Sequence, residues 1–271
     1  MPTQDRQRRH ALSPKSLIVT ADDFGFDASV NAAVRRAHRS GVLRFASLMV
    51  LRPGADEAAA IARENPGLGV GLHLELCAEA PAKAGLRYFF DPRARAGLEG
   101  EIRGQIEALL SLGVKPTHAD GHFNVHVHPV IFPVLCGLCR EYAIPRVRLP
   151  SGELSVWLEH PGARELATPA AAAVFAVMGA WVRGAARGLE APRSWGLLRS
   201  GLMNEDYVLR LLSRLPDGPT EIYFHPCLDP DSAVTDRPTA THQTITEFET
   251  LMSPRVRDAV DKGGVRLVSP P

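Results

Sequence analysis

Short apolar runs alternate with amphipathic segments along most of the chain. The runs have the length and composition of buried strands, and the segments between them carry apolar residues three and four positions apart, as helices do. The expected strands cover residues 17–20, 45–51, 68–76, 144–150, 194–198, 221–226 and 265–268. The expected helices cover residues 27–40, 55–64, 98–112, 130–142, 163–189, 204–215 and 246–262. This alternation is typical of an α/β protein built on a parallel sheet.

No linker, internal repeat or Gly-rich phosphate-binding fingerprint interrupts the alternation. A length of 271 residues suits one large barrel or two small domains, and the uninterrupted pattern favours the barrel. We therefore expect a single TIM-like (β/α) barrel, distorted and with seven or eight strands, over residues 16–271. Residues 1–15 are polar and are expected to form a flexible tail.

Composition places few limits on function. An apolar content of 45% and a charged content of 23% are typical of soluble globular proteins, and a net charge of +1 gives no case for a nucleic-acid partner. The N-terminal arginines are not followed by an apolar run that suits a signal peptide, so we expect a cytoplasmic protein, with the inner membrane surface as an alternative position. Four cysteines are too few for a disulfide framework, and Cys136 and Cys139 match only half of a redox or zinc motif.

Acidic and imidazole side chains occupy or follow several of the expected strands. Asp22 and Asp23 come directly after the first strand, where α/β folds keep their catalytic groups. Taken alone, Asp23 is also explained as a helix cap. His73 lies in the third strand and shares a face with Glu75, and taken alone it is also explained as a buried structural histidine.

Four of the ten histidines fall within eleven residues, together with an aspartate; they are His118, His122, His126 and His128, with Asp120. Two histidines, one carboxylate and an open water position form a known catalytic arrangement for zinc-like cations. Asp23, His73 and one histidine of this stretch would complete such a site. The other histidines and Asp120 would support the ligands or contact substrate. A structural metal site is the alternative, but four protein ligands would close it and the carboxylate of Asp22 would be superfluous.

Further features bear on the site. Arg146 and Arg148 alternate onto one side of their strand, so we expect at least one of them to face the cavity and keep the acidic pair ionised; an exposed edge pair is the alternative. His225 follows an apolar strand and suits an acid/base pair.

Residues 79–97 form either a loop over the site mouth or a packed surface loop. Residues 163–189 form either a core helix or an apolar lid that meets a lipid.

Four sequence blocks carry these residues: Ala21-Asp22-Asp23-Phe24-Gly25 with Asn31, Gly71-Leu72-His73-Leu74, Thr117-His118-Ala119-Asp120-Gly121-His122 with His126 and His128, and Phe224-His225-Pro226. In this order they resemble the signature blocks of the YdjC-like carbohydrate deacetylases. The resemblance implies that Asp22 is the catalytic base, that Asp23, His73 and His122 bind the metal, and that His225 is the general acid or stabilises the transition state. The remaining expected substrate contacts or supports of the ligands are Asp120, Asn124, His126, His128, Arg148 and Trp195.

The resemblance also bears on cofactor and substrate. The Asp/His/His set accepts a divalent cation, zinc first, with nickel, cobalt, manganese or magnesium as alternatives. Residues 194–201 and 220–226 resemble the branch associated with hopanoid biosynthesis, which implies an N-acetylglucosaminyl hopanoid as substrate. The alternative of an apolar lid at residues 163–189 adds peripheral contact with a membrane as an expectation. Phe123 and Asn124 stand in the expected pocket where family members often carry histidines. A chitooligosaccharide deacetylase, a metal-dependent hydrolase of another bond and a noncatalytic sugar-lipid binding protein are the alternatives. We expect a homodimer.

Overall fold

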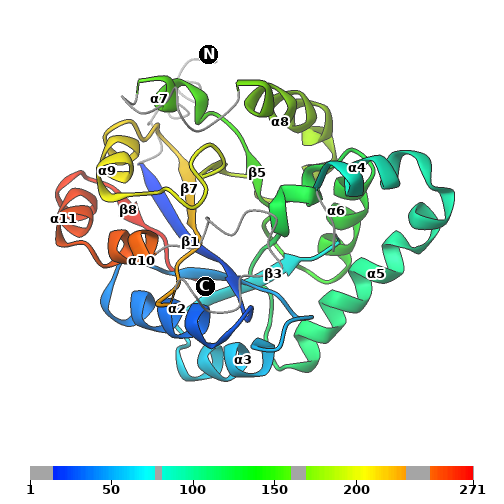
Figure 1. The fold of residues 1–271 in the computed structure, drawn as a ribbon, viewed down its shortest axis with the longest axis horizontal. Coiled ribbons are helices and arrows are strands. Elements are labelled where there is room, and N and C mark those ends of the chain that lie inside the picture. The colour runs from blue at the N-terminus through cyan, green and yellow to red at the C-terminus, as the bar shows by residue number, and fades with distance from the viewer. Residues whose placement is uncertain (1–14, 77–80, 160–168, 230–244, 271) are drawn as a thin grey trace, which may run out of the picture.

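The computed structural model describes residues 15–76, 81–159, 169–229 and 245–270. The strands are parallel and curl around a common axis, with helices on the outside (Figure 1). Their order is β4-β3-β2-β1-β7-β6-β5, and β8 pairs with the start of β1. A single main-chain bridge between Ala119 and Val147 links β4 to the segment that leads into β5. The expected distorted (β/α) barrel is confirmed.

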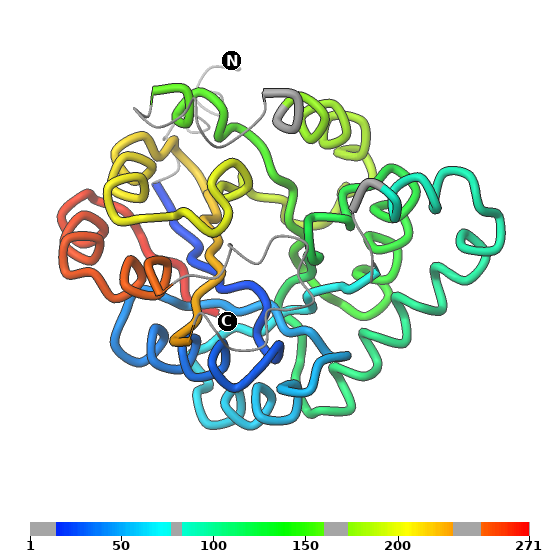
Figure 2. The backbone as a smooth tube through the Cα atoms, in the orientation of Figure 1, coloured from blue at the N-terminus to red at the C-terminus, as the bar shows by residue number. Residues whose placement is uncertain are grey.

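Strand β1, which covers Ser16–Phe24, lies at the centre of the strand order. It pairs with β2 (Phe45–Leu48) along one edge and with β7 (Pro219–Phe224) along the other. The other strands are β3 (Gly69–Leu74), β4 (Ala119–Gly121), β5 (Leu149–Pro150), β6 (Arg193–Trp195) and β8 (Arg266–Leu267). Figure 2 shows β1, in blue, beside β7, in orange, although they come from opposite parts of the chain.

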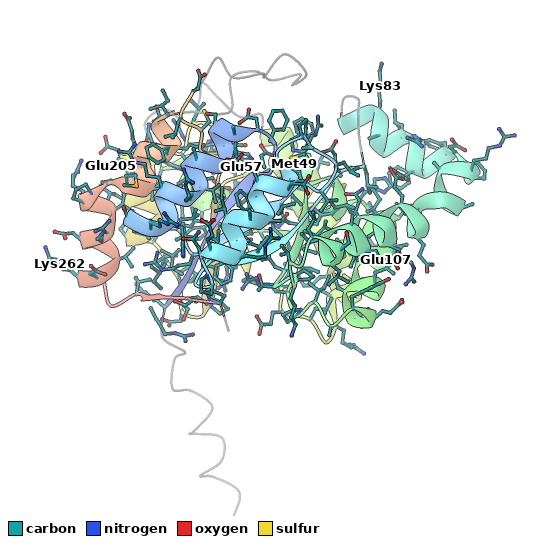
Figure 3. All side chains as sticks on the ribbon, turned by 90° about the horizontal axis from the view of Figure 1, so that it is seen from below. Met49, Glu57, Lys83, Glu107, Glu205 and Lys262 are labelled. Atoms are coloured by element: carbon teal, nitrogen blue, oxygen red, sulfur yellow. The ribbon has the colours of Figure 1, made fainter. Side chains whose placement is uncertain are left out.

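The helices cover the outside of the barrel. They are α2 (Ala28–Ser40), α3 (Ala55–Glu64), α4 (Pro81–Phe90), α5 (Pro92–Ser111), α6 (Ile131–Glu141), α7 (Leu154–Leu158), α8 (Pro169–Val182), α9 (Glu205–Ser213), α10 (Ile245–Met252) and α11 (Pro254–Lys262), with 3₁₀ segments η2 (His122–Val127) and η3 (Arg183–Ala186). Figure 3 shows Lys83 and Lys262 pointing from these helices away from the barrel. None of the helices in the described ranges is both long and apolar enough to span a bilayer.

The expected loop over residues 79–97 and the expected helix over residues 246–262 differ from the observed elements. Residues 81–97 do not form an irregular loop, because α4 and the start of α5 occupy them. Asp91 begins α5 by accepting a hydrogen bond from the amide of Arg93 at 2.8 Å, and Pro92 has the backbone angle that suits a first helical turn. The helix expected over residues 246–262 is broken before Pro254, which has no amide proton to donate to the preceding turn. Ser253 caps the new helix there.

Helix α8 is apolar but is not the core helix that its composition predicts. Val174, Val177 and Trp181 are exposed by 54%, 66% and 71%, whereas Gly179 and Val182 are buried. An ideal Cβ atom at Gly179 would lie 3.7 Å from Leu149, so this side of the helix packs on β5. The other side presents apolar side chains to solvent. Residues 163–168, like residues 1–14 of the expected tail and residues 79–80, lie outside the described ranges.

The interior of the barrel is lined by polar side chains, whereas branched apolar residues fill most barrels of this kind. These buried side chains include Thr20, Ser47, His118, Asp120, Arg146, Arg148, Ser194 and Glu221. They bond across strands: Thr20 of β1 donates to Glu221 of β7 at 2.8 Å, and Ser47 of β2 donates to Asp120 of β4 at 2.7 Å. A buried polar network therefore runs through the barrel to the carboxyl ends of its strands.

Candidate active site and metal centre

Two aspartates end β1 and point to different partners. The register of β1 against β2 shifts at these two residues, between Ala21 and Phe24, and Asp23 has a φ of 63°, in the left-handed region that aspartate tolerates better than most residues. The amide of Phe26 donates to the Asp23 carbonyl at 3.0 Å and closes the turn. Asn31 of α2 holds the turn, because its side-chain oxygen accepts from the amide of Gly25 at 2.8 Å. This backbone leaves Asp22 facing the barrel interior and Asp23 facing the histidines of β3 and η2.

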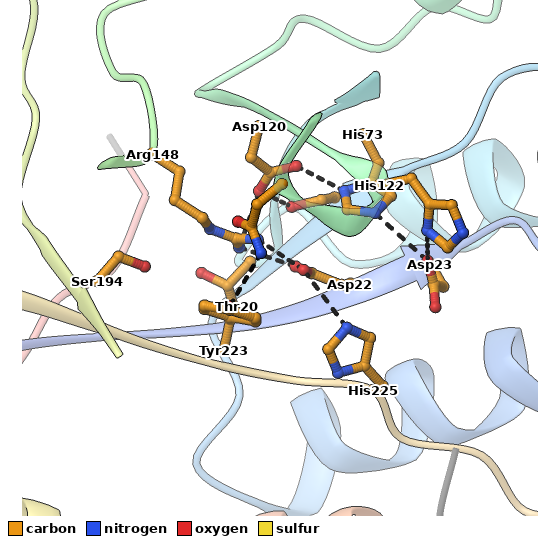
Figure 4. A network of polar contacts seen from close by, with 12 residues as sticks. Thr20, Asp22, Asp23, His73, Asp120, His122, Arg148, Ser194, Tyr223 and His225 are labelled. Atoms are coloured by element: carbon orange, nitrogen blue, oxygen red, sulfur yellow. Dashed lines mark hydrogen bonds and ion pairs between the residues drawn. The ribbon is translucent and has the colours of Figure 1, made fainter. Parts of the chain in front are cut away.

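Asp23 lies against two histidines from different parts of the barrel (Figure 4). Its Oδ1 is 3.0 Å from Nδ1 of His122 and 3.3 Å from Nε2 of His73. One ligand atom from each of the three residues lies within 4.8 Å of those of the others, and all three residues are buried. Strand β3 supplies His73, and η2, directly after β4, supplies His122. The structure thus brings together the three residues expected to bind a metal.

The surroundings of His73 fit a metal ligand. Its Nδ1 lies 2.6 Å from Oδ1 of Asp120, with which it is paired in the β3–β4 register. A neutral ring that donates its Nδ1 proton to Asp120 turns the lone pair of Nε2 toward Asp23. Carboxylates that hold ligating histidines in this way fix the tautomer and the ring orientation in many metal sites. The donor set and its support therefore suit a divalent cation.

The distribution of buried charge favours a cation at the same place. Among the described residues, five carboxylates, of Asp22, Asp23, Asp120, Glu221 and Glu247, are buried in or beside the barrel interior, and the guanidinium groups of Arg146 and Arg148 face them. Asp22, His73 and Asp120 form a second cluster with metal-ligating atoms, but Arg148 already pairs with both carboxylates there. A cation is therefore better accommodated by Asp23, His73 and His122.

Arg148 crosses the interior to Asp22. Nη1 donates to Oδ2 of Asp22 at 2.6 Å, and Nη2 donates to Oδ1 at 2.8 Å. Nη2 is also 2.8 Å from Oδ2 of Asp120, and Nε donates to Oε2 of Glu221 at 3.1 Å. The ring of Tyr223 covers the guanidinium, with Cζ 4.1 Å from the ring centroid. Burial raises the pKa of Asp22, and the charge of Arg148 opposes this rise without cancelling it.

Arg146 is also buried, but it lies away from the acidic pair. Its Cζ is 4.4 Å from the ring centroid of Phe45, deeper in the barrel. Burial, followed by the charge of Arg146, lowers the pKa of His118 to about 3. Both arginines of the expected pair therefore face inward, and the interpretation as an exposed edge pair is wrong.

His225 follows β7 and lies beside Asp22. Its Nε2 is 3.8 Å from Oδ2 of Asp22, and its Nδ1 is 3.7 Å from Oε2 of Glu247 on α10. Glu247 also accepts hydrogen bonds from the amides of His225 and Met203. Burial lowers the pKa of His225, but Glu247 and the two aspartates outweigh it, so the pKa is raised overall. The site thus holds a histidine that favours its protonated form beside Asp22.

Asn124 and His126 lie next to these groups in different ways. The side-chain amide of Asn124 donates to the hydroxyl of Tyr223 at 3.2 Å. Nε2 of His126 lies 3.1 Å from the carbonyl oxygen of Arg148, and burial lowers the pKa of the ring to about 4. Asn124 is therefore part of the site, whereas neutral His126 supports the backbone that carries Arg148.

His128 and Trp195 are not brought to the site. His128 packs on Phe89, with ring centroids 4.1 Å apart, and accepts a hydrogen bond from the amide of Val130 at 3.2 Å. Ser194 points into the barrel, where it donates to Glu221 at 2.8 Å. Because neighbouring residues of a strand point to opposite faces, Trp195 points out of the barrel.

Glu221, Tyr223 and Glu247 belong to the site but were not anticipated from the sequence. Glu221 and Tyr223 carried a signal, because they alternate with apolar residues and share a strand face with His225. A charged residue on that face of a buried strand predicts a buried polar partner. Glu247 carried no local signal, since only the packing of α10 against the end of β7 brings it to His225.

Comparison with known proteins agrees with this architecture. Residues 16–262 match the family described as YdjC-like protein. A carbohydrate deacetylase from Brevibacillus brevis is 40% identical over 147 residues, which cover 49% of this chain and 59% of that protein. A carbohydrate deacetylase from Geobacillus stearothermophilus is 38% identical over 144 residues, again 49% of this chain and 59% of the relative. The chain thus matches somewhat less than two thirds of these curated relatives.

The fold is shared with a crystal structure from Enterococcus faecalis V583, of a protein whose proposed role is cellobiose-phosphate cleavage. The two chains superpose with a TM-score of 0.72 at 22% identity, covering 94% of this chain and 97% of the other. A sequence identity of 22% with this TM-score shows a shared fold but not a shared function. The family match, by contrast, covers nearly the whole barrel, including Asp22, Asp23, His73, His122 and His225. The chain therefore belongs to the YdjC-like protein family.

Proposed function

We propose that this protein is a metal-dependent deacetylase that hydrolyses the acetamide group of an N-acetylated amino sugar. The position of Asp22 carries the proposal. Its carboxylate is next to the Asp23, His73 and His122 set in sequence and space, yet it pairs with Arg148 and lies 3.8 Å from His225. Ligands for a cation, with a separate base and a separate acid, support amide hydrolysis. The relatives named carbohydrate deacetylase support the sugar.

Each residue has one role in this mechanism. A divalent cation bound by Asp23, His73 and His122 would supply Lewis-acid polarisation of the acetyl carbonyl and a lowered pKa of water. Asp22 removes a proton from the water whose oxygen attacks the acetyl carbon, and Arg148 holds the carboxylate of Asp22 in place. His225 donates a proton to the nitrogen as the C–N bond breaks. The products are acetate and the free amino sugar.

A phosphoester hydrolase is the main alternative with the same cation. It needs cationic side chains that are free to bind phosphate. Arg148, the guanidinium that reaches Asp22, is engaged by three carboxylates, and Arg146 stacks on Phe45. These contacts favour a neutral acetamide over a phosphate. A noncatalytic sugar-lipid binding protein would have no need of the Asp22–His225 pair.

As substrate we propose a lipid-linked amino sugar, first an N-acetylglucosaminyl hopanoid, with a chitooligosaccharide as the alternative. Exposed apolar side chains around η2 support the lipid. On α4, Leu86 and Phe90 are exposed by 58% and 79%, and on α8 the exposed face includes Trp181. Both helices pack on η2, which carries His122. Apolar patches beside a polar site suit an amphiphilic substrate.

The same surface supports peripheral contact of a cytoplasmic protein with the inner membrane. Arg183 and Arg187 follow the apolar α8, and residues 169–188 contain no acidic residue. Aromatic and basic residues beside an apolar helix face suit an anionic lipid surface. Co-sedimentation tests this membrane contact. The vesicles contain phosphatidylcholine, with and without phosphatidylglycerol. The test variant is Val177→Glu, and the matched control is Leu110→Glu, at an exposed apolar residue of α5. Loss of binding in Val177→Glu alone supports the contact, and no binding by the unmodified protein contradicts it.

Acetate release tests the proposed function directly. The purified protein, with its metal content measured, is assayed on an N-acetylglucosaminyl hopanoid and on a soluble chitooligosaccharide, each with and without chelator. Chelator-sensitive release from the lipid alone supports the whole proposal, and release from the soluble sugar alone keeps the reaction but discards the lipid. Absence of release from either substrate by metal-loaded protein contradicts deacetylation of these sugars. The molar mass of the same sample, measured by light scattering, tests the expected homodimer. Elemental analysis of the bound metal tests the expectation of zinc.

A further inference from the structure

Glu221 is a buried carboxylate that does not face the open end of the site. It lies on β7, and its two oxygens accept four hydrogen bonds. Oε1 accepts from Thr20 at 2.8 Å and from Nη2 of Arg148 at 3.1 Å. Oε2 accepts from Ser194 at 2.8 Å and from Nε of Arg148 at 3.1 Å. Strands β1 and β6 therefore hold Glu221 from both sides, and Glu221 holds Arg148.

Glu221 accepts a hydrogen bond from Nε of Arg148, which neither Asp22 nor Asp120 contacts. Asp22 and Asp120 bind only the Nη atoms of Arg148, at the tip of the side chain. A guanidinium held only at its tip can still turn about the end of its flexible stem. Glu221 binds at Nε and Nη2 together and so fixes the guanidinium plane, while Tyr223 covers one face at 4.1 Å.

The charge of Glu221 fits this role. Burial by itself would raise the pKa of Glu221, but the charge and hydrogen bonds of Arg148 bring it down to about 2. An ionised carboxylate accepts at both oxygens, which matches the four hydrogen bonds donated to Glu221.

We propose that Glu221 is a positioning residue for the reaction, acting through Arg148 on Asp22. It sets the plane of the guanidinium, and the two-fold pairing of Arg148 then sets the orientation of the Asp22 carboxylate toward the attacking water. The proposal rests on the proposed function for its activity readout. It also makes a separate structural statement: Asp22, Asp120 and Glu221 form a cradle shaped for a guanidinium ion.

Chemical rescue tests this role. Arg148→Ala removes the guanidinium and leaves its three carboxylates, so a few millimolar guanidinium chloride, far below denaturing concentrations, is expected to restore acetate release at least about tenfold. In Arg148→Ala/Glu221→Gln the rescue is expected to be lost. Arg148→Ala/Glu153→Gln is the matched control, because Glu153 is an equally buried carboxylate whose partners include the amide of Gly196 at 3.0 Å but not Arg148. Rescue is expected to survive in that control.

Kinetics of the single variants separate positioning from general damage. Glu221→Gln is expected to lower kcat about tenfold or more with little change in KM or in bound metal. In the Arg148→Ala background the same substitution is expected to cost almost nothing further, because its path to Asp22 is already broken. Three outcomes would each overturn the proposal. One is an unchanged kcat in Glu221→Gln, and another is a loss of kcat in the double variant that equals the sum of the two single losses in free energy. The third is guanidinium rescue of Arg148→Ala/Glu221→Gln that equals the rescue of Arg148→Ala.

A melting comparison keeps this test separate from the proposed function. Guanidinium chloride at a few millimolar is expected to raise the melting temperature of Arg148→Ala relative to sodium chloride at equal ionic strength, and not to raise that of Arg148→Ala/Glu221→Gln. If no substrate releases acetate, the proposed function fails, but this shift still tests the cradle. Equal shifts of the melting temperature in Arg148→Ala and Arg148→Ala/Glu221→Gln would contradict the guanidinium cradle, whether or not the protein releases acetate.

Discussion

Nδ1 of His73 lies 2.6 Å from Oδ1 of Asp120, and this contact leaves Nε2 of His73 facing Asp23 and His122. The ring nitrogen of His73 that is available to a cation is therefore selected by a residue on the neighbouring strand. The remaining oxygen of Asp120 accepts from Ser47 at 2.7 Å and pairs with Arg148 at 2.8 Å. Asp120 thus connects His73, a proposed metal ligand, to Arg148, the side chain that pairs with Asp22.

Replacement of Asp120 tests this coupling. Asp120→Asn is expected to weaken zinc binding by roughly 10–100-fold, because the amide no longer fixes the tautomer of His73. Competition with a chromogenic chelator measures the affinity. Asp258→Asn, on the exposed surface of α11, is the control for a lost aspartate charge. An unchanged zinc affinity in Asp120→Asn would mean that Asp120 does not support the ligand.

Asp22 and the metal ligands are expected to respond differently to substitution. Asp22→Asn is expected to lower turnover by roughly 10²–10⁴-fold while the bound metal stays, because only the proton acceptor is lost. His73→Ala and His122→Ala are expected to lose both metal and turnover. Metal analysis beside the acetate assay separates the two classes. A fully active Asp22→Asn variant would rule out Asp22 as the base.

The pH dependence of turnover tests the proposed role of His225 as the general acid. Its raised pKa keeps the ring protonated above the ordinary histidine range, and activity that needs the proton falls as the pH rises through this raised pKa. Glu247→Gln removes the largest contribution that raises the pKa, so the alkaline fall in kcat/KM is expected to move to lower pH. Glu249→Gln, on the exposed side of the same helix, serves as control. If the two profiles coincide, His225 is not the acid.

The thiols of Cys136 and Cys139 are expected to be inert in the folded protein. Both are buried on α6, and burial raises their pKa values to about 11 and about 12, so almost no thiolate exists at neutral pH. Iodoacetamide labelling followed by peptide mass mapping is expected to modify them only after unfolding. Rapid native labelling of either one would reopen a redox or metal role for this pair.

The convergence of the site could be predicted from sequence because of the parallel sheet. Asp23, His73 and His122 lie at or just beyond the carboxyl ends of three strands, and these ends meet at one edge. The sequence did not by itself select one histidine among the four near residue 120. That choice depends on the chain direction after His122, where Phe123 and Asn124 both have a φ of 54° and turn the later histidines away.

Other parts of the site depend on tertiary packing. Periodicity put Arg146 and Arg148 on one face but could not say which of them reaches Asp22, because that depends on their depth along the barrel. The sequence predicts a loop over residues 79–97, because the apolar residues there show no regular spacing. Helix α4 forms within this stretch, where it contacts α5 and η2. The apolar sequence of α8 was compatible with a core helix or with an apolar lid, and the structure shows that one side of the helix is exposed.

The central position of β1 has a consequence for folding. It comes before the other described strands along the chain, but its partner β7 pairs Pro219 with Ser16, and β8 pairs Arg266 with the same residue. Contacts that span more than about 200 residues close late, because large loops must lose their entropy first. The edge of β1 that faces β7 therefore stays unpaired until residues 219–224 have been made, although its other edge pairs with β2 early. Asp22 and Asp23 are the first residues of the site to be made and among the last to be enclosed.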